Sequence, residues 1–102
     1  MSTFAQIDPG RIDIAANMMR AIANPMRLAI LGYLSEGEEF NVTEIHRLAH
    51  IEQSTASHHL GILKDKGILN SRREGKNTYY SLKNRNFKKL MECVSNCACF
   101  NE

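Results

Sequence analysis

Residues 51–69 have the sequence IEQSTASHHLGILKDKGIL, and the polar stretch NSRREGKNTYYSL follows at 70–82. Within the first stretch, Ala56, Leu60 and Leu63 recur at helical spacing, which gives a helix one apolar side. The other side carries short polar or charged side chains, namely Ser54, Thr55, Ser57, His58 and Lys64. A small core can hold the apolar side of such a helix while its polar side enters the major groove of DNA. The pattern therefore predicts a recognition helix.

The segments around this helix predict four more helices and a β-hairpin. The preceding helix, a short turn and the recognition helix form a helix-turn-helix, in which the recognition helix begins between Glu52 and Ser54 and ends near Gly67. The other expected elements are a tail at 1–10, helices at 11–23 and 25–35, a short strand at 40–42, a third helix capped by Asn41 or Thr43, strands at 68–73 and 77–82, and a last helix at 84–96. The expected fold class is mainly α with a small β wing: a winged helix-turn-helix with five helices and two or three short strands.

The length and composition favour one ordered domain. A chain of 102 residues is enough for a single small domain, so we expect residues 1–102 to form one unit. No apolar run approaches the roughly 20 residues that cross a bilayer, and the opening MSTFAQIDPG lacks the pattern of a signal peptide. The expectation is a cytoplasmic protein with no membrane partner.

The charge distribution is more informative than the net charge of +2. Residues 1–53 contain four Lys or Arg and seven Asp or Glu, whereas residues 54–89 contain nine Lys or Arg and two Asp or Glu. A basic half that begins with the expected recognition helix is typical of a nucleic-acid-binding surface. Double-stranded DNA is therefore the expected partner.

Four segments at matching spacing carry a family resemblance. They are Ala23-Asn24-Pro25-Met26-Arg27-Leu28, Gln53-Ser54-Thr55-Ala56-Ser57-His58-His59-Leu60, Leu63 with Gly67-Ile68-Leu69, and Arg72-Arg73-Glu74-Gly75-Lys76 through Tyr79-Tyr80-Ser81-Leu82. With them, nearly the whole chain resembles the ArsR/SmtB winged-helix repressors of bacteria and archaea. The resemblance implies a homodimer that binds an imperfect palindrome and releases it when an inducer binds. It places the dimer interface on the first and last helices, where the apolar positions are Ile12, Ala15, Met18, Met19, Ile22, Phe87, Leu90, Met91 and Val94.

Direct contacts to DNA are expected from the recognition helix and the wing. Side chains in the first turns of a recognition helix reach base edges, which assigns this role to Gln53, Ser54, Ser57 and His58. An alternative for Ser54 is that it only caps the helix. His59 is expected to be a partly buried packing residue or a phosphate contact. A glycine at position 61 indicates that another backbone or DNA approaches closely there, or that the helix simply tolerates the glycine. In the wing, the expected phosphate or minor-groove contacts are Arg72, Arg73 and Lys76.

All three cysteines, Cys93, Cys97 and Cys99, lie within seven residues of the chain. Cys93 and Cys97 are one helical turn apart, and Cys99 could join them if the helix frays. Three thiolates suit a thiophilic ion such as arsenic, antimony, zinc or copper, and the same thiols could form a redox or persulfide switch. Two alternatives remain open: thiols that only pack as small apolar side chains, and a constitutive repressor without a ligand.

The family's usual metal sites do not transfer to this sequence. The paired thiolates that many relatives carry at the third helix fall on Asn41 and Thr43, and the metal ligands of the last helix fall on Asn84, Asn86, Cys97 and Phe100. His46 and His50 are spaced for a zinc-binding pair on the third helix, but surface histidines are favoured because no further ligand lies nearby in sequence.

Two other function classes are disfavoured. An enzyme would need a phosphate-binding glycine loop, paired acids or a Cys-His arrangement, and the sequence has none of these motifs. A protein-binding winged helix that no longer contacts DNA would have lost the basic character of its wing.

Overall fold

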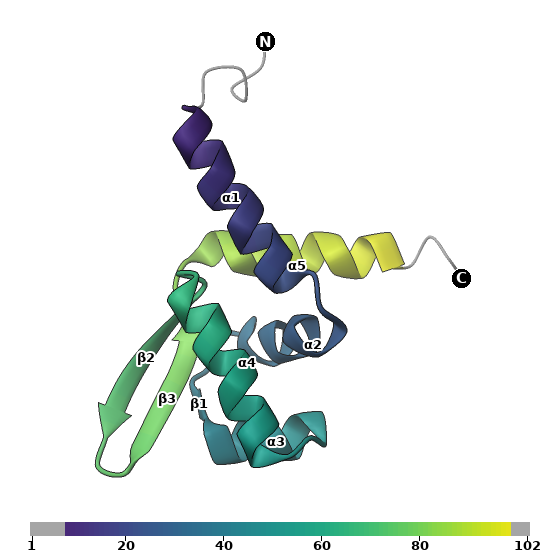
Figure 1. Cartoon of the computed structure of the whole chain (residues 1–102). Helices are drawn as coiled ribbons and strands as arrows, with labels where there is room; N and C mark the ends of the chain where they lie inside the picture. Colours follow the sequence, from purple (N-terminus) through teal and green to yellow (C-terminus); the bar gives the residue numbers. More distant parts are fainter. Residues whose placement is uncertain (1–7, 99–102) are drawn as a thin grey trace.

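The computed structural model describes residues 8–98, which form five helices and one three-stranded sheet (Figure 1). The elements in order are α1 (Pro9–Ile22), α2 (Pro25–Leu34), β1 (Phe40–Asn41), α3 (Val42–Ala49), α4 (Gln53–Asp65), β2 (Leu69–Glu74), β3 (Asn77–Leu82) and α5 (Arg85–Ala98). The predicted fold class is confirmed. Two boundaries differ by two residues. Pro9 and Gly10 belong to α1 rather than to a tail, because Asp8 caps the helix by accepting a hydrogen bond from the Gly10 N–H, and α5 continues to Ala98 rather than ending at residue 96.

Short-range capping interactions fix where α2 and α3 begin. The Asn24 side chain accepts hydrogen bonds from the backbone N–H groups of Met26 and Arg27 at 2.9 and 3.1 Å, as expected for an N-cap followed by proline. At α3, Asn41 and Glu44 form a capping box, with each side chain bonded to the other residue's backbone N–H at 2.8 and 2.9 Å. Asn41 is therefore the cap, which decides between the two predicted candidates.

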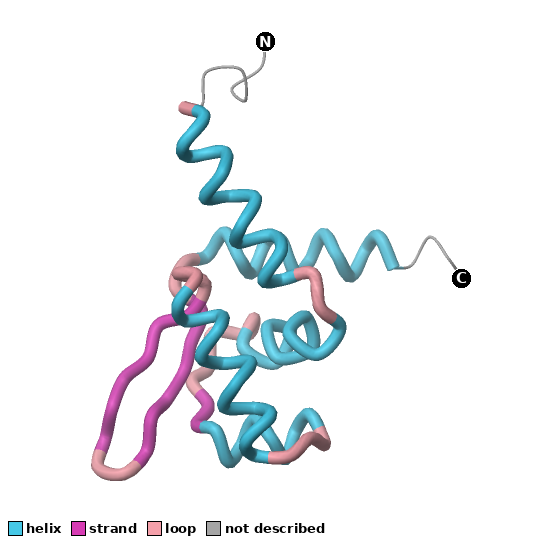
Figure 2. Tube along the Cα trace, viewed as in Figure 1, coloured by secondary structure: helices cyan, strands magenta, loops and turns pink. Residues whose placement is uncertain are grey.

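The sheet has the strand order β1-β3-β2, and all its pairs are antiparallel (Figure 2). In this register, Asn41 of β1 and Arg72 of β2 both lie opposite Tyr79 of β3. Gly75 turns the hairpin with a φ of +61°, a conformation that favours glycine. The hairpin projects away from the helices as a wing, and its turn lies at the same end of the molecule as α3 (Figure 1).

The core lies where α2, α3 and α4 meet the base of the sheet. From α4 it receives Ala56, Leu60 and Leu63, each with no exposed surface. The other fully or almost fully buried side chains are Ala21, Ile22, Ile30, Leu31, Leu34, Ile45, Ile68 and Leu69. Because the apolar side of α4 is packed in this way, its opposite side must face solvent.

Candidate nucleic-acid interface

The first two turns of α4 present an exposed polar surface. Its described members are Gln53, Ser54, Thr55, Ser57 and His58, all of which are exposed. The N-cap of α4 is Glu52, and Ser54 lies inside the first turn, so the capping role considered for Ser54 is excluded. Short polar side chains held on a packed helix can reach the base edges of a major groove without moving the backbone.

His59 lies at the edge of this surface and is partly buried. Its Nδ1 accepts a hydrogen bond from Arg27 Nε–H at 3.2 Å, and Arg27 Nη1–H donates to the Ala21 carbonyl at 3.1 Å. Burial lowers the pKa of His59 below its ordinary value of 6.5, and the charges of Arg27 and His58 lower it further. Because Nδ1 accepts, the neutral ring carries its proton on Nε2, which is left as a donor. His59 is therefore partly buried, as predicted, while its Nε2 remains a possible donor to phosphate.

The later turns of α4 contribute less polar surface. Lys64 is exposed in the last turn, and Gly61 is half-buried. A Cβ added at Gly61 would meet no heavy atom of the described protomer within 4 Å. Within one protomer, therefore, no close backbone approach explains the glycine.

The three basic residues of the wing differ in their surroundings. Arg72 is engaged by two carboxylates: Nη2 lies 2.9 Å from Glu39 Oε1, and Nη1 lies 2.8 Å from Glu74 Oε2. Arg73 makes only a long hydrogen bond, 3.4 Å from Nε to the Gly75 carbonyl oxygen. Lys76 is exposed beside the turn. No local pattern predicts the contact between Arg72 and Glu39, since Glu39 lies 33 residues earlier.

The basic half of the sequence does not form one continuous surface. Lys83, Arg85, Lys88 and Lys89 line a hollow that Ser35 and Gly37 border at the end of α2. The six residues of β3 separate them from the wing turn, a distance of about 20 Å at the usual rise of a strand. Figure 1 shows the start of α5 at the base of the wing, away from α3. These four residues are therefore not part of the surface formed by α4 and the wing turn.

Comparison with known proteins agrees with this geometry. The family described as a helix-turn-helix domain matches residues 22–72. The biofilm growth-associated repressor of Xylella fastidiosa is 33% identical over 92 residues, which cover 90% of this chain and 80% of the relative. The cadmium resistance transcriptional regulatory protein CadC homolog of Staphylococcus aureus is 38% identical over 77 residues, covering 76% of this chain and 64% of the relative.

A solved structure extends the similarity to almost the whole fold. It is the homodimeric winged helix-turn-helix DNA-binding domain of a possible ArsR-family regulator from Mycobacterium bovis. It superposes with a TM-score of 0.79 at 31% identity, covering 96% of this chain and 87% of that one. The chain belongs to the ArsR/SmtB family. Proteins of this family are DNA-binding transcriptional regulators and not enzymes, which confirms the predicted function class.

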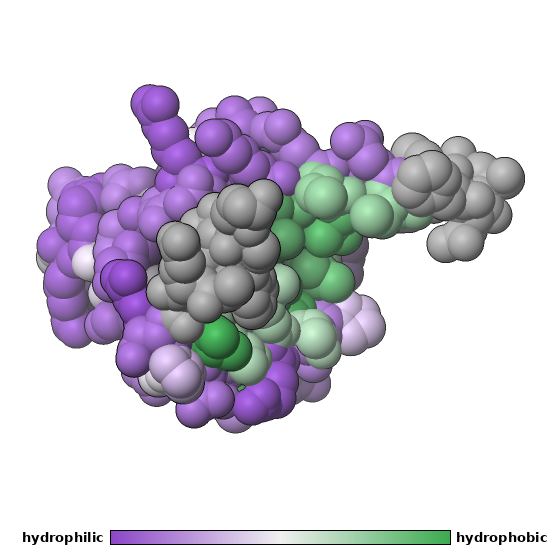
Figure 3. Space-filling model, turned by 90° about the horizontal axis from the view of Figure 1, so that it is seen from above, coloured by the Kyte–Doolittle hydropathy of each residue, from purple (hydrophilic) through white to green (hydrophobic). Residues whose placement is uncertain are grey.

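The family resemblance implies that α1 and α5 form the dimer interface, and many of the predicted positions on them retain exposed surface. Ile14 and Met19 of α1 are 61% and 52% exposed, and Ala15 is also exposed. Six of the other predicted interface residues are half-buried: Ile12, Met18, Phe87, Leu90, Met91 and Val94. Figure 3 shows hydrophobic surface along α5 beside α1. An apolar surface of this kind is typical of an interface.

Two residues of α1 differ in exposure from the pattern that the predicted interface assumed. Ile22 is only 5% exposed and belongs to the protomer's own core, so it leaves little surface for a partner. Ile14 was not among the predicted positions, although it is the most exposed of the large hydrophobic side chains among residues 8–98. An apolar stripe identifies the buried side of a helix but does not distinguish the core from a partner.

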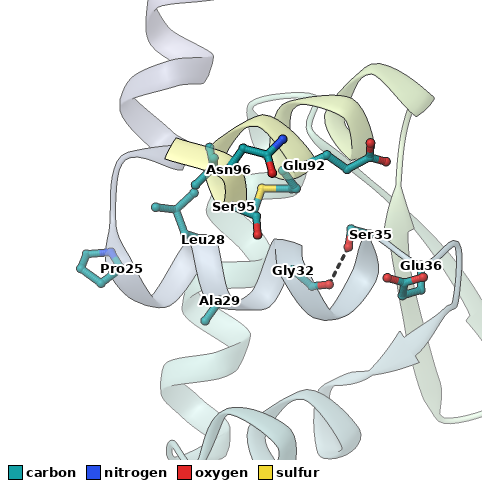
Figure 4. Close-up of a pocket in the computed structure, with 11 residues that line it drawn as sticks. Pro25, Leu28, Ala29, Gly32, Ser35, Glu36, Glu92, Ser95 and Asn96 are labelled. Carbon is teal, nitrogen blue, oxygen red and sulfur yellow. Dashed lines mark hydrogen bonds between the residues drawn. The ribbon is translucent and has the colours of Figure 1, made fainter. Parts of the chain in front are cut away.

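Two of the three predicted thiols lie on α5. Cys93 and Cys97 are both free and exposed, and Cys99 lies outside the described residues. A separate open pocket of about 750 Å³ lies between α2 and α5, and its lining includes Leu28, Gly32 and Ser95 but neither Cys93 nor Cys97 (Figure 4). Among residues 8–98, no three His, Cys, Asp or Glu side chains come together as metal ligands.

The possible histidine pair for zinc is not formed. His50 lies beyond the end of α3 in a left-handed conformation with a φ of +56°, so it does not share a helix face with His46. His46 Nδ1 lies 3.1 Å from the Ile51 carbonyl oxygen instead. Across residues 8–98, every helix is too short or too polar to cross a bilayer.

Proposed function

We propose that this protein is a homodimeric repressor that binds a palindromic operator and is released by a thiophilic or thiol-reactive inducer. The observation that carries the DNA-binding part is the exposed polar surface of α4, formed by Gln53, Ser54, Thr55, Ser57 and His58, on a helix that buries Ala56, Leu60 and Leu63 on its other side. The homodimeric relative and the apolar surface of α1 and α5 support the dimer. Because the partner is DNA, the site of action is the cytoplasm of a bacterial or archaeal cell.

The proposed contacts divide by type of readout. Gln53, Ser54, Ser57 and His58 contact base edges, because they occupy the first turns of α4. Thr55, His59 and Lys64 flank these residues and contact the backbone, with His59 donating from Nε2. Arg73 and Lys76 are the phosphate contacts of the wing, since neither makes an ion pair in the described structure.

Mobility shifts on the region upstream of the protein's own gene test these roles. Each phosphate contact contributes about −0.9 to the slope of log affinity against log salt, so Arg73→Ala in a dimer reduces the slope by about 1.8. We expect the same loss of affinity on operator and non-operator duplexes. His58→Ala instead reduces the preference for the operator and leaves the slope unchanged. An unaltered titration for both variants would contradict the docking.

The proposed sensor comprises the thiols of the last helix. Cys93 and Cys97 are exposed, free and one turn apart, which suits either a soft ion or oxidation to a disulfide or persulfide. A thiophilic ion would be held by these two sulfurs and by Cys99, which lies outside the described residues. A change at α5 alters the separation of the two recognition helices, which must lie about one DNA turn apart. An allosteric coupling of about 1–3 kcal/mol changes affinity roughly 5–150-fold.

The inducer is identified by adding arsenite, zinc, cuprous ion or a persulfide donor to the preformed operator complex. We expect one of these to release the wild-type protein and to have no effect on a variant with Cys93→Ser, Cys97→Ser and Cys99→Ser. A matched control with His46→Asn and His50→Asn should respond like the wild type. Hydrogen peroxide, which can oxidise two thiols to a disulfide, is added as a fifth agent. If none of the five releases the wild type, the sensing proposal is wrong.

A further inference from the structure

The guanidinium of Arg72 is surrounded by groups from three strands or their ends. Arg72 Nε lies 3.2 Å from both carboxylate oxygens of Glu39, and Nη2 lies 2.9 Å from one of them. Nη1 donates to Glu74 at 2.8 Å, and the guanidinium carbon lies 4.9 Å from the centre of the Tyr79 ring. All three guanidinium nitrogens of Arg72 donate hydrogen bonds to carboxylates. Two of them pair with one carboxylate, that of Glu39, a bidentate geometry that fixes the orientation of the guanidinium.

The sheet register explains how these groups meet. Arg72, Tyr79 and Asn41 lie opposite one another across β2, β3 and β1, so they share one face of the sheet. Glu39 lies two residues before Asn41. Because side chains two residues apart in an extended chain point the same way, Glu39 lies on the same face of the sheet as Asn41, Tyr79 and Arg72. Arg72 therefore extends over Tyr79 and reaches the residue that precedes β1. Because α3 starts directly after β1, this contact connects the wing to the helix-turn-helix.

The local charge is unsuited to holding phosphate. One positive guanidinium faces two carboxylates, so the three side chains together carry a net negative charge. The hydrogen bond from Arg72 lowers the pKa of Glu39, and the two carboxylates raise the pKa of Arg72. The neighbouring Arg73 lies on the other face of the strand, and within residues 8–98 it forms no ion pair.

We propose that Arg72 is a positioning residue, paired with Glu39, that sets the angle of the wing relative to α3 and α4, and that it makes no phosphate contact. The inference rests on the proposed DNA binding. It assigns to Arg73 and Lys76 the charges that the wing presents to DNA. Arg72, which the sequence grouped with them, has a different role.

The test compares Arg72→Gln, Glu39→Gln, the double variant and the matched control Arg73→Gln in operator titrations across a salt series. Thermal melting confirms that each variant is folded. We expect Arg72→Gln and Glu39→Gln to weaken binding by a similar factor, roughly two- to fivefold per half-site, as suits an exposed pair. The double variant should bind no more weakly than either single variant, and the salt slope should stay at the wild-type value for all three. Arg73→Gln should reduce the slope by about 1.8.

Two results overturn the proposal. If Arg72→Gln reduces the slope as Arg73→Gln does, then Arg72 contacts phosphate. If Glu39→Gln strengthens binding, then Glu39 only competes with DNA for the guanidinium. Both differ from failure of the proposed function, in which the wild type itself would show no salt-dependent affinity for the operator.

Discussion

Replacement of Arg27 by methionine tests whether the Arg27–His59 contact holds the recognition helix in place. Methionine keeps most of the apolar stem and removes two hydrogen bonds, to His59 Nδ1 at 3.2 Å and to the Ala21 carbonyl at 3.1 Å. We assign about 1.5 kcal/mol to each, the lower end for a charged donor, because the contacts are only part-buried. The expected loss is about 3 kcal/mol, a large part of the 5–15 kcal/mol typical of a domain.

The loss should depend on pH. Burial, then the charge of Arg27, then that of His58 lower the pKa of His59 in the folded protein, so the unfolded chain binds the proton more readily. This contribution to stability is complete above about pH 6.5 and is lost as the pH falls through the lowered pKa. In Arg27→Met the pKa of His59 returns toward 6.5, so the free energy of unfolding of the variant depends less on pH in that range. The difference between wild type and variant is therefore larger at pH 8 than at pH 5.

Urea unfolding at pH 8 and pH 5, at one fixed protein concentration because of the dimer, measures both effects. At about 4–8 °C per kcal/mol, the loss corresponds to a melting temperature lower by about 12–24 °C. Arg20→Met, at an exposed position of α1, is the matched control and should change stability by less than about 0.5 kcal/mol. An equal loss at the two pH values, together with an unshifted His59 pKa in an NMR titration, would refute the reasoning.

Three further predictions concern local structure. Gly61→Ala should raise the free energy of unfolding by about 1 kcal/mol, since no side chain or other element of the described protomer lies within 4 Å of the new methyl group. A loss of stability in this variant would indicate a contact made only in the dimer. Gly67→Ala, at a φ of +78°, should instead lower the free energy of unfolding by about 1–2 kcal/mol. Asn41→Ala should cost about 0.5–2 kcal/mol in urea unfolding, and adding Glu44→Ala should cost less than the sum of the two changes, because they form one capping box. Leu60→Ala should cost about 2–5 kcal/mol by calorimetry, and a smaller loss would show that the core around α4 relaxes.

Much of the fold could be predicted because its determinants are local. Asn24-Pro25 sets the start of α2 through bonds that span two or three residues, and Gly67 and Gly75 adopt the positive φ that their positions suggested. The helical spacing of Ala56, Leu60 and Leu63 similarly identified the buried side of α4. Each of these features is decided by neighbours in the sequence, so the sequence alone contains it.

The contacts that distinguish the site residues from one another could not be predicted. Glu39 with Arg72, and Arg27 with His59, are separated by 33 and 32 residues, and no local pattern identifies either pair. Ile22 shares the spacing of its neighbours on α1, yet it is buried within the protomer. Long-range packing decides these cases, and it became visible only when the elements were assembled.

Asn41 has two structural roles, one in the sheet and one at the start of α3. It pairs with Tyr79 as the last residue of β1, and its side chain caps the first turn of α3. No spacer therefore separates sheet from helix, and an inserted residue here would displace either the strand register or the cap. The wing and the helix-turn-helix should consequently approach a duplex as one stiff body, so that any adjustment to operators of different spacing has to come from the joint between the two subunits.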